Sequence, residues 1–337
     1  MRLLITGGAG YIGSHVCARL LEAGHDVVVI DNFSNSDRDN LSRVMEVSGR
    51  ELTWIEADVR DRLRIRETLS QDDFDAILHF AALKSAPDSI RHPERHHDVN
   101  VGGTTILLEE TLRAGVDKFV FCSSAAVYGV QHSARARETD NPCPTTPYAR
   151  TKVAGEQLLR NAAHTRVEFK TCSLRCFNPI GAHPSGLLGY HFTHQPEDLL
   201  SRVLAARHHR RAIDIYGTDH DTSDRSAVRD FVHVVDIADG CMAALAFLAD
   251  GVDRNSNQWT FNLGTGRPCS VLELIGAMEK VGEMPILKRE RPRRAGDISI
   301  SVADPTSSAA TLKWQAWRSL EEACADALTA FDISLSR

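Results

Sequence analysis

A glycine-rich loop near the start of the chain restricts the possible folds more than any other feature of the sequence. The loop, ITGGAGYIGSH, follows a short apolar run and leads into an amphipathic segment at residues 12–23. It contains the spacing G-x-G-x-x-G at Gly8, Gly10 and Gly13, and the wider spacing G-x-x-G-x-x-G at Gly7, Gly10 and Gly13. Glycines so placed permit a tight turn, close approach of a pyrophosphate and close packing of a helix on a strand. The loop therefore predicts a dinucleotide-binding unit of strand, loop and helix.

Short apolar runs alternate with helical patterns through the first half of the chain. The runs lie at Leu3–Ile5, Val27–Ile30, Leu52–Ile55, Ala76–Phe80, Phe119–Phe121 and Thr171–Leu174. The alternation predicts βαβ units with right-handed crossovers, and hence an α/β protein with a Rossmann-type, doubly wound parallel sheet. After Asn178 the pattern is less regular. We expect residues 1–178, with part of 229–264 as a candidate addition, to form the dinucleotide-binding domain. Residues 179–337 should form a smaller, mixed α/β substrate domain.

Charge and cysteine content exclude several classes of protein. The net charge of −6 and the pI near 6.2 give no basic excess for a nucleic-acid partner. The sequence has no apolar run of about eighteen residues, so we expect no membrane span. Its first residues do not read as a signal peptide. The eight cysteines include no C-x-x-C pair. We therefore expect no metal site, no disulfide framework and a reducing, cytoplasmic location.

Two acidic residues at the ends of predicted strands extend the cofactor hypothesis. Asp31 closes the second apolar run, after the glycine loop and its helix. A carboxylate at this point accepts hydrogen bonds from the hydroxyls of an adenosine ribose and repels a 2′-phosphate, which favours NAD over NADP. The alternative is that Asp31 only caps a turn. Asp58 follows the third run, where it is a weaker candidate to bind the adenine amine.

A serine and a tyrosine–lysine pair form a candidate acid–base cluster. Ser124 ends the fifth apolar run, and ligands of open α/β sheets bind at this edge. Tyr148 and Lys152 are four residues apart, so they share one face of a helix. A lysine cation about 4 Å from the phenol contributes roughly 4 kcal/mol at an effective dielectric of about 20. We therefore expect the pKa of Tyr148 to fall from about 10 towards neutrality, as a general base requires. The alternative is an ordinary pair on a helix surface.

With these features in order, the sequence resembles the extended short-chain dehydrogenase/reductases and, within them, the UDP-galactose (UDP-glucose) 4-epimerase family. The resemblance covers nearly the whole chain. It rests on the motifs ITGGAGYIGSH, DNFSNS, HFAALKS, SSAAVYG, YARTK, RCFNPIGAHPSG, VRDFVHVVD and FNLGTG. It implies a tightly bound NAD, a UDP-sugar substrate and a homodimer.

The resemblance also implies roles for individual residues. The implied catalytic residues are Ser124, Tyr148 and Lys152. The implied cofactor-binding residues are Gly7, Gly10, Tyr11, Ile12, Gly13, Asp31, Asn32, Asn35, Asp58, Val59, Phe80, Ala81, Lys84, Asn100, Tyr148 and Lys152. The implied substrate-binding residues are Lys84, Ser124, Asn178, Asp198, Tyr216, Arg229, Arg294, Asp297 and Ser301.

The activity implied by the resemblance is the interconversion of UDP-galactose and UDP-glucose. Tyr148 would take the proton of the sugar 4-hydroxyl while the hydride on C4 passes to NAD, which gives a 4-keto sugar and NADH. The keto sugar would then turn its other face to the NADH and receive the hydride back with inverted configuration. Because NAD is regenerated in each cycle, it would stay bound as a prosthetic group.

Several positions depart from the family pattern, and two sites among them bear on the substrate. The usual Pro-Asn-Asn-Leu is Pro-Glu-Asp-Leu here, so the carboxylate of Asp198 stands where an amide faces the diphosphate. We expect it to repel the substrate unless it turns away. Ser301 stands where the family has a large aromatic residue beside C2 of the sugar, so UDP-N-acetylhexosamines are an alternative substrate class. Further alternatives are a related NAD-dependent nucleotide-sugar enzyme and an NAD-binding regulator.

Overall fold

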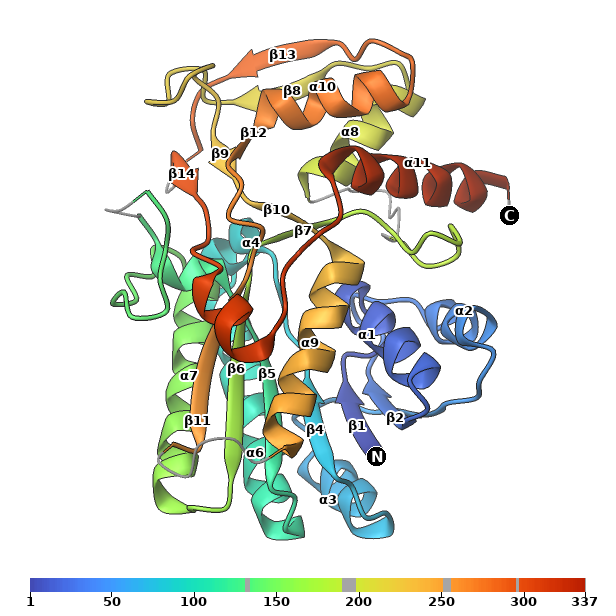
Figure 1. Ribbon diagram of the computed structural model, residues 1–337, viewed down its shortest axis with the longest axis vertical. Helices are drawn as coiled ribbons and strands as arrows, with labels where there is room; N and C mark the ends of the chain where they lie inside the picture. Colours follow the sequence, from blue (N-terminus) through green and yellow to red (C-terminus); the bar gives the residue numbers. More distant parts are fainter. Residues whose placement is uncertain (131–133, 190–197, 251–255, 295–296, 337) are drawn as a thin grey trace.

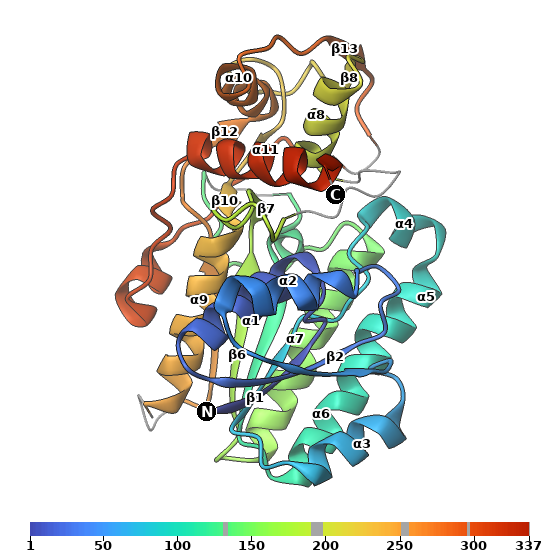
Figure 2. The ribbon, with the colours of Figure 1, turned by 90° about the vertical axis from the view of Figure 1, so that its right-hand side faces the viewer.

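The computed structural model describes residues 1–130, 134–189, 198–250, 256–294 and 297–336. These residues form a large parallel sheet with helices on both faces, and a smaller part above the carboxyl ends of its strands (Figures 1 and 2). The arrangement confirms the Rossmann-type α/β class predicted from the sequence. None of the helices within these ranges has the length and apolar character that crossing a membrane requires.

The large sheet has seven strands in the order β11-β6-β5-β4-β1-β2-β3, and all neighbours run parallel. The strands are β1 (Arg2–Thr6), β2 (Asp26–Asp31), β3 (Thr53–Glu56), β4 (Ala76–His79), β5 (Lys118–Ser124), β6 (Lys170–Cys176) and β11 (Gln258–Leu263). The strand order reverses between β1 and β4. Ligands of doubly wound sheets bind outside the carboxyl ends of the strands at such a switch point.

Successive residues of the central strands face two separate cores. Leu3 and Ile5 of β1 pack in the core beneath α1, α2 and α9, whereas Leu4 packs in the core beneath α3, α6 and α7. Because both faces are covered, the strands are continuously apolar instead of alternating with polar residues. These helices are α1 (Tyr11–Glu22), α2 (Asp39–Ser48), α3 (Arg62–Gln71), α6 (Gly103–Ala114), α7 (Pro147–Thr165) and α9 (Val234–Ala249).

A late part of the sequence, within 229–264, completes the large sheet. Helix α9 packs against α1, and β11 pairs with β6 from Gln258 opposite Thr171 to Leu263 opposite Cys176 (Figure 1). The chain thus leaves the first part of the molecule after β6 and returns to it before its last helices. As a result, the cofactor half is not one continuous segment.

The smaller part has its own core beside a parallel pair of strands, β8 and β13. Its helices α8, α10 and α11 contribute Leu204, Met278 and Phe331 to that core. Its elements are α8 (Leu199–His208), α10 (Val271–Val281), α11 (Leu320–Ser336), β8 (Ile213–Tyr216) and β13 (Lys288–Arg291). Shorter elements connect the two parts or flank the sheet edge: α4 (Ala86–Arg91), α5 (Pro93–His97), β7 (Asn178–Ile180), β9 (Val228–Arg229), β10 (Phe231–His233), β12 (Cys269–Ser270) and β14 (Ile300–Ser301).

Candidate active site

The glycine loop between β1 and α1 leaves the start of the helix open to an anion. Gly7 has a φ of +74°, and a Cβ on Gly13 would lie 2.1 Å from the carbonyl oxygen of Gly7, so neither position tolerates a side chain. Gly10 precedes the helix without a side-chain cap, and the first turn holds no acidic residue. The free N–H groups and the positive end of the helix dipole therefore face outward, as a pyrophosphate requires.

Asp31 lies at the end of β2, beside this loop, and is held in place before any ligand binds. It is buried; its Oδ2 accepts from the N–H of Ala9 at 3.0 Å, and its Oδ1 accepts from the N–H of Phe33 at 2.9 Å and from the hydroxyl of Ser36 at 2.8 Å. Carboxylate oxygens have further acceptor capacity. A ribose can therefore bind to a carboxylate that is already oriented, which fits the adenosine end of NAD.

The predicted adenine side is a small network of charges. Asn32 donates to Asp58 Oδ2 at 2.8 Å, and Arg60 pairs with the same carboxylate at 2.8 Å. The guanidinium of Arg60 lowers the pKa of Asp58 to about 2. Val59 is buried and packs closely against Gly103 at the start of α6. Asp58 is thus ionised at neutral pH, and both of its oxygens already accept bonds from Asn32 or Arg60.

Asn100 fixes the loop that follows β4 and carries Phe80, Ala81 and Lys84. Its side-chain oxygen accepts from the N–H of Leu83 at 2.8 Å, and its amide donates to the Leu83 carbonyl at 2.9 Å and to Thr151 Oγ1 at 3.0 Å. The Asn100 side chain is thus hydrogen-bonded to other residues of the protein, and it joins the loop to helix α7. Asn35 adds a bond to the Ala82 carbonyl at 3.2 Å.

The predicted catalytic residues come together at the carboxyl ends of β5 and β6. Ser124 ends β5, and Tyr148 and Lys152 occupy the first two turns of α7, which starts at Pro147 behind the N-cap Thr146. Lys152 is buried, and its Nζ lies 6.0 Å from the centre of the Tyr148 ring. A hydrogen bond links Tyr148 to Ser124. The three side chains thus form one cluster from two adjacent elements.

The expected lowering of the tyrosine pKa is wrong for this arrangement of side chains. Burial raises the pKa of Tyr148 well above its usual range, and the hydrogen bond with Ser124 only partly opposes this. The ammonium of Lys152 donates to the Cys122 carbonyl at 2.8 Å, and burial lowers the pKa of the lysine. Desolvation, which the sequence pattern does not reveal, is the largest influence on the pKa of both groups. The positive nicotinamide ring of NAD⁺ is a further charge that favours the phenolate.

The predicted substrate residues of the smaller part are paired with one another. Arg229 binds Asp297 at 2.8 Å, and the guanidinium of Arg294 lies 3.8 Å from the centre of the Tyr216 ring. Ser301 on β14 is in register with Arg229 on β9. Asn178, also predicted on this side, is exposed at the start of β7.

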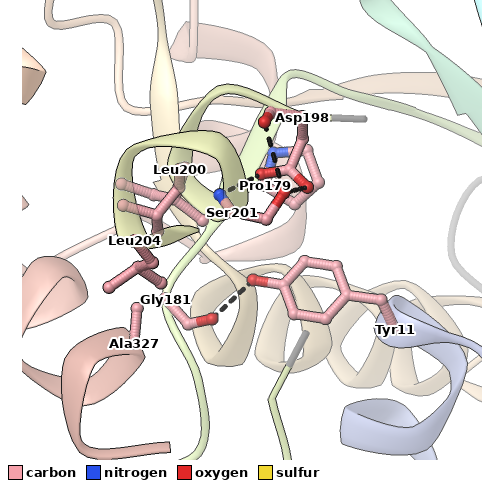
Figure 3. Close-up of a pocket in the computed structure, with 9 residues that line it drawn as sticks. Tyr11, Pro179, Gly181, Asp198, Leu200, Ser201, Leu204 and Ala327 are labelled. Atoms are coloured by element: carbon pink, nitrogen blue, oxygen red, sulfur yellow. Dashed lines mark hydrogen bonds between the residues drawn. The ribbon is translucent and has the colours of Figure 1, made fainter. Parts of the chain in front are cut away.

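Asp198 has turned into the helix that follows it. Its Oδ1 accepts from the N–H of Ser201 at 2.9 Å and its Oδ2 accepts from the Ser201 hydroxyl, so it caps the start of α8 (Figure 3). The residue lines a small pocket next to Tyr11, whose hydroxyl donates to the Gly181 carbonyl at 2.7 Å (Figure 3). The cap uses part of the acceptor capacity of Asp198, but its negative charge remains at the edge of the site.

Several residues that support the site were not predicted from the sequence. Arg202 on α8 places a second cation near Tyr216, 5.3 Å from the ring centre. Asp230, next to Arg229, is fully buried and accepts from the N–H groups of Thr265, Gly266 and Ala303. The position of Asp230 in VRDF, opposite the glycines of FNLGTG, is the signal that could have indicated it. For Arg202 we find no such signal.

The fold, the glycine loop and the Ser–Tyr–Lys cluster define an oxidoreductase-type enzyme of the short-chain dehydrogenase/reductase class, built around a dinucleotide. The model of the NAD dependent epimerase/dehydratase family matches residues 3–264. The chain belongs to this family, and NAD is confirmed as its cofactor. No group of three or more potential ligands for a metal ion occurs within the described ranges.

Characterised relatives are similar over almost the whole chain. The UDP-glucose 4-epimerase of Bacillus subtilis is 41% identical over 97% of this chain and 95% of its own length. A crystal structure of the UDP-glucose 4-epimerase from Stenotrophomonas maltophila with bound NAD and formylated UDP-arabinopyranose has a TM-score of 0.95 at 40% identity, with 100% and 99% of the two chains covered. The Bifidobacterium longum enzyme in complex with NAD⁺ and UDP has a TM-score of 0.94 at 35% identity, with 99% of each chain covered. The resemblance inferred from the sequence is thus confirmed.

Proposed function

We propose that this protein interconverts UDP-galactose and UDP-glucose by inverting C4 of the sugar. The observation that carries the proposal is the meeting of Ser124, Tyr148 and Lys152 beside a glycine loop that fits NAD. The relatives named above as UDP-glucose 4-epimerases support the same activity. The Arg229–Asp297 and Arg294–Tyr216 pairs supply cations, a carboxylate and a ring suited to a uridine diphosphate.

The residues of the cluster divide the chemistry among them. Tyr148 is placed to remove the proton of the sugar 4-hydroxyl and to return it to the 4-keto sugar after the sugar has turned over. Ser124 hydrogen-bonds the tyrosine and can hold the oxygen that changes charge. Lys152 keeps a positive charge near the phenol ring and can bind the ribose hydroxyls of the cofactor. NAD, when bound, supplies the acceptor and donor of the hydride.

A direct experiment tests the activity and the retention of cofactor together. The purified protein is incubated with UDP-galactose without added NAD, and the products are followed by proton NMR. UDP-glucose is the expected product, since NAD should remain bound through purification. The proposal fails if no UDP-glucose forms either in this reaction or in a second one supplied with NAD.

A second candidate substrate class is the UDP-N-acetylhexosamines. Ser301 is small, buried and in register with Arg229, so it leaves room beside the sugar. A Campylobacter jejuni structure described as a UDP-Glc/GlcNAc 4-epimerase, 34% identical with a TM-score of 0.84, supports this second substrate class. The same NMR assay with UDP-N-acetylglucosamine decides the question. Turnover of UDP-glucose without turnover of the N-acetylated sugar excludes this class.

We also propose that the chain acts as a homodimer in the cytoplasm. The resemblance to the 4-epimerase family motivates the dimer, and the free thiols of the buried cysteines suit a reducing compartment. Light scattering coupled to gel filtration tests the dimer, since one chain has a mass of 37.2 kDa. An elution at that mass contradicts it.

A further inference from the structure

A buried ion pair lies directly behind the catalytic cluster. Arg175 on β6 binds Glu156 on α7 through two bonds, from Nη2 to Oε2 at 2.8 Å and from Nε to Oε1 at 2.9 Å. The Ser123 hydroxyl donates to the same Oε1 at 2.6 Å. The two side chains are 2% and 1% exposed. Ser123, Glu156 and Arg175 therefore form a buried polar unit inside the sheet-and-helix layer, from which Arg175 also donates to the Glu138 carbonyl at 3.3 Å.

Two members of this unit lie near catalytic residues in the chain. Glu156 follows Lys152 by four residues and Tyr148 by eight, so the three share one face of α7. Ser123 immediately precedes Ser124 on β5 and is in register with Arg175 on β6. The ion pair thereby joins α7, which carries the phenol and the ammonium, to β6, and the Ser123 hydrogen bond joins α7 to β5, which carries Ser124.

Stability alone is a poor reason for such a pair. Removing two charges from water costs about as much as their attraction returns, so a buried ion pair seldom adds net stability over apolar side chains. The carboxylate of the pair does have an electrostatic effect on the lysine. Burial lowers the pKa of Lys152, and Cys122, Cys176 and the carboxylate of Glu156, in that order, oppose this. His79 on β4 also faces the lysine and is neutral, because burial lowers its pKa to about 3.

We propose that Glu156 is a positioning residue of the reaction: bound by Arg175 and Ser123, it holds α7 on the ends of β5 and β6 and places a carboxylate on the helix face that carries Tyr148 and Lys152. The carboxylate acts through the lysine and not on the sugar. This inference rests on the proposed function for its meaning in catalysis. Its electrostatic part is a property of the protein without substrate and is measurable even if the proposed activity fails.

The test is a direct titration of Lys152. The chain has seven lysines, so the protein labelled with ¹³C at lysine Cε gives few signals, and Lys152→Met identifies the one of interest. Glu156→Gln should lower the pKa of Lys152, because an opposite charge is lost. Arg175→Lys keeps a cation beside the carboxylate and should not lower it. If the pKa of Lys152 is unchanged in Glu156→Gln, or falls equally in Arg175→Lys, the proposal is overturned.

Glu110 provides a matched control. Its carboxylate is also buried and bound to arginines, Arg62 at 2.9 Å and Arg66 at 2.9 Å, but it lies on α6 and is not among the groups that shift Lys152. Glu110→Gln should reduce the melting temperature without moving the lysine titration. An equal shift of Lys152 in this variant would show a general effect of destabilisation and would overturn the proposal.

The kinetic readout is the pH profile. In Glu156→Gln the alkaline limb of the kcat profile should move to lower pH with the lysine, while KM for the UDP-sugar changes less than about threefold, because the sugar contacts are untouched. If Glu156→Gln does not fold, Glu156→Met/Arg175→Leu replaces the pair with apolar side chains, which buried ion pairs tolerate. The alkaline limb of the kcat profile should also lie at lower pH in that variant. An alkaline limb at the wild-type pH in the folded variant contradicts the proposal.

Discussion

The cofactor side and the substrate side of the site differ in what holds their binding groups. On the cofactor side, Asp31 is fixed by backbone N–H groups and Asn100 by the backbone of Leu83. On the substrate side, Arg229 and Asp297 bind each other, and Arg294 rests on the ring of Tyr216. The first set is already oriented for a ligand. The second set must exchange internal partners for ligand partners.

This difference predicts different responses to mutation. In a preorganised site the binding groups are already ordered, so little free energy is spent on ordering them when the ligand binds. Replacing an anchoring residue of such a site therefore removes most of the affinity which that residue contributes. In a site whose residues bind each other, the ligand must first break that internal pair. Removing one partner loses a ligand contact but also removes the pair that had to be broken, so the affinity for the ligand falls less. The variants below probe this contrast, from the largest expected effect to the smallest.

Tyr148→Phe should reduce kcat by about 10²- to 10⁴-fold, the usual loss when an acid–base group is removed. The phenol ring and its packing remain, so bound NAD and the melting temperature should stay as in the wild type. Steady-state kinetics with UDP-galactose and absorbance of the purified cofactor give both quantities. Full activity in this variant would rule out the assigned role of the tyrosine.

Asp31→Asn should weaken NAD binding by about 10- to 100-fold, because hydrogen bonds to a charged group contribute roughly 1.5–3 kcal/mol each. The protein should then lose its cofactor during gel filtration and recover activity when NAD is added. Asp26→Asn, an exposed carboxylate at the start of the same strand, is the matched control. Equal retention of NAD in both variants contradicts a preorganised ribose site.

Arg229→Met should raise KM for the UDP-sugar by about tenfold and leave NAD content unchanged, because one charge-assisted contact to the diphosphate is lost. Asp297→Asn frees Arg229 from its ion pair and should raise KM less. The two Michaelis constants, measured side by side, decide whether the pair must open for binding. If both variants raise KM equally, the exchange of partners is not what limits affinity.

Tyr216→Leu should raise KM about three- to tenfold, the loss expected for an aromatic face worth roughly 0.5–1.5 kcal/mol. Arg202→Met removes the more distant of the two cations near that ring and should have a smaller effect. Competition by UMP against UDP-galactose measures the uracil contribution separately. An unchanged inhibition constant in Tyr216→Leu would place the base elsewhere.

His79→Asn should lower stability, because buried packing and hydrogen bonds are lost, and should also change its pH dependence. Burial lowers the pKa of His79 to about 3, and its ring nitrogens bond Thr6 at 2.6 Å and Thr104 at 2.9 Å. The folded state therefore binds fewer protons than the unfolded state. The stabilisation is complete above about pH 6.5 and is lost as the pH falls towards 3.

In His79→Asn the free energy of unfolding should fall less steeply between pH 5.5 and 4.5, by about 1.4 kcal/mol per pH unit, the value for one proton. Urea denaturation at several pH values measures the slope. His164→Asn, at an exposed position on α7, is the control. Identical slopes in the wild type and His79→Asn would show that His79 is protonated in the fold.

The sequence predicted those features that depend on local order. The glycine loop, Asp31 at a strand end and the spacing of Tyr148 and Lys152 are each set by a few consecutive residues. The parallel sheet follows from the alternation of apolar runs and helices, and the family resemblance added the residues of the substrate side. All of these features could be predicted from the sequence alone.

The features that were missed depend on residues far apart in the chain. Arg229 and Asp297 are 68 residues apart, and Ser123 meets Glu156 over 33 residues. Strand register and helix packing, rather than any local motif, bring such side chains together. The pKa of Tyr148 was mispredicted for a related reason, since burial is a property of the whole fold and here exceeds the effect of the hydrogen bond with Ser124.

The late return of the chain to the large sheet has a consequence for its synthesis. Strand β6 ends at Cys176, but its outer neighbour β11 ends at Leu263. At about 5–20 residues per second, the ribosome takes roughly 5–20 s to make the segment between them. During that interval the nascent chain carries an open strand edge, the kind of surface that pairs with other chains. We therefore expect a nascent protein of this architecture to need protection by a chaperone until β11 has been made.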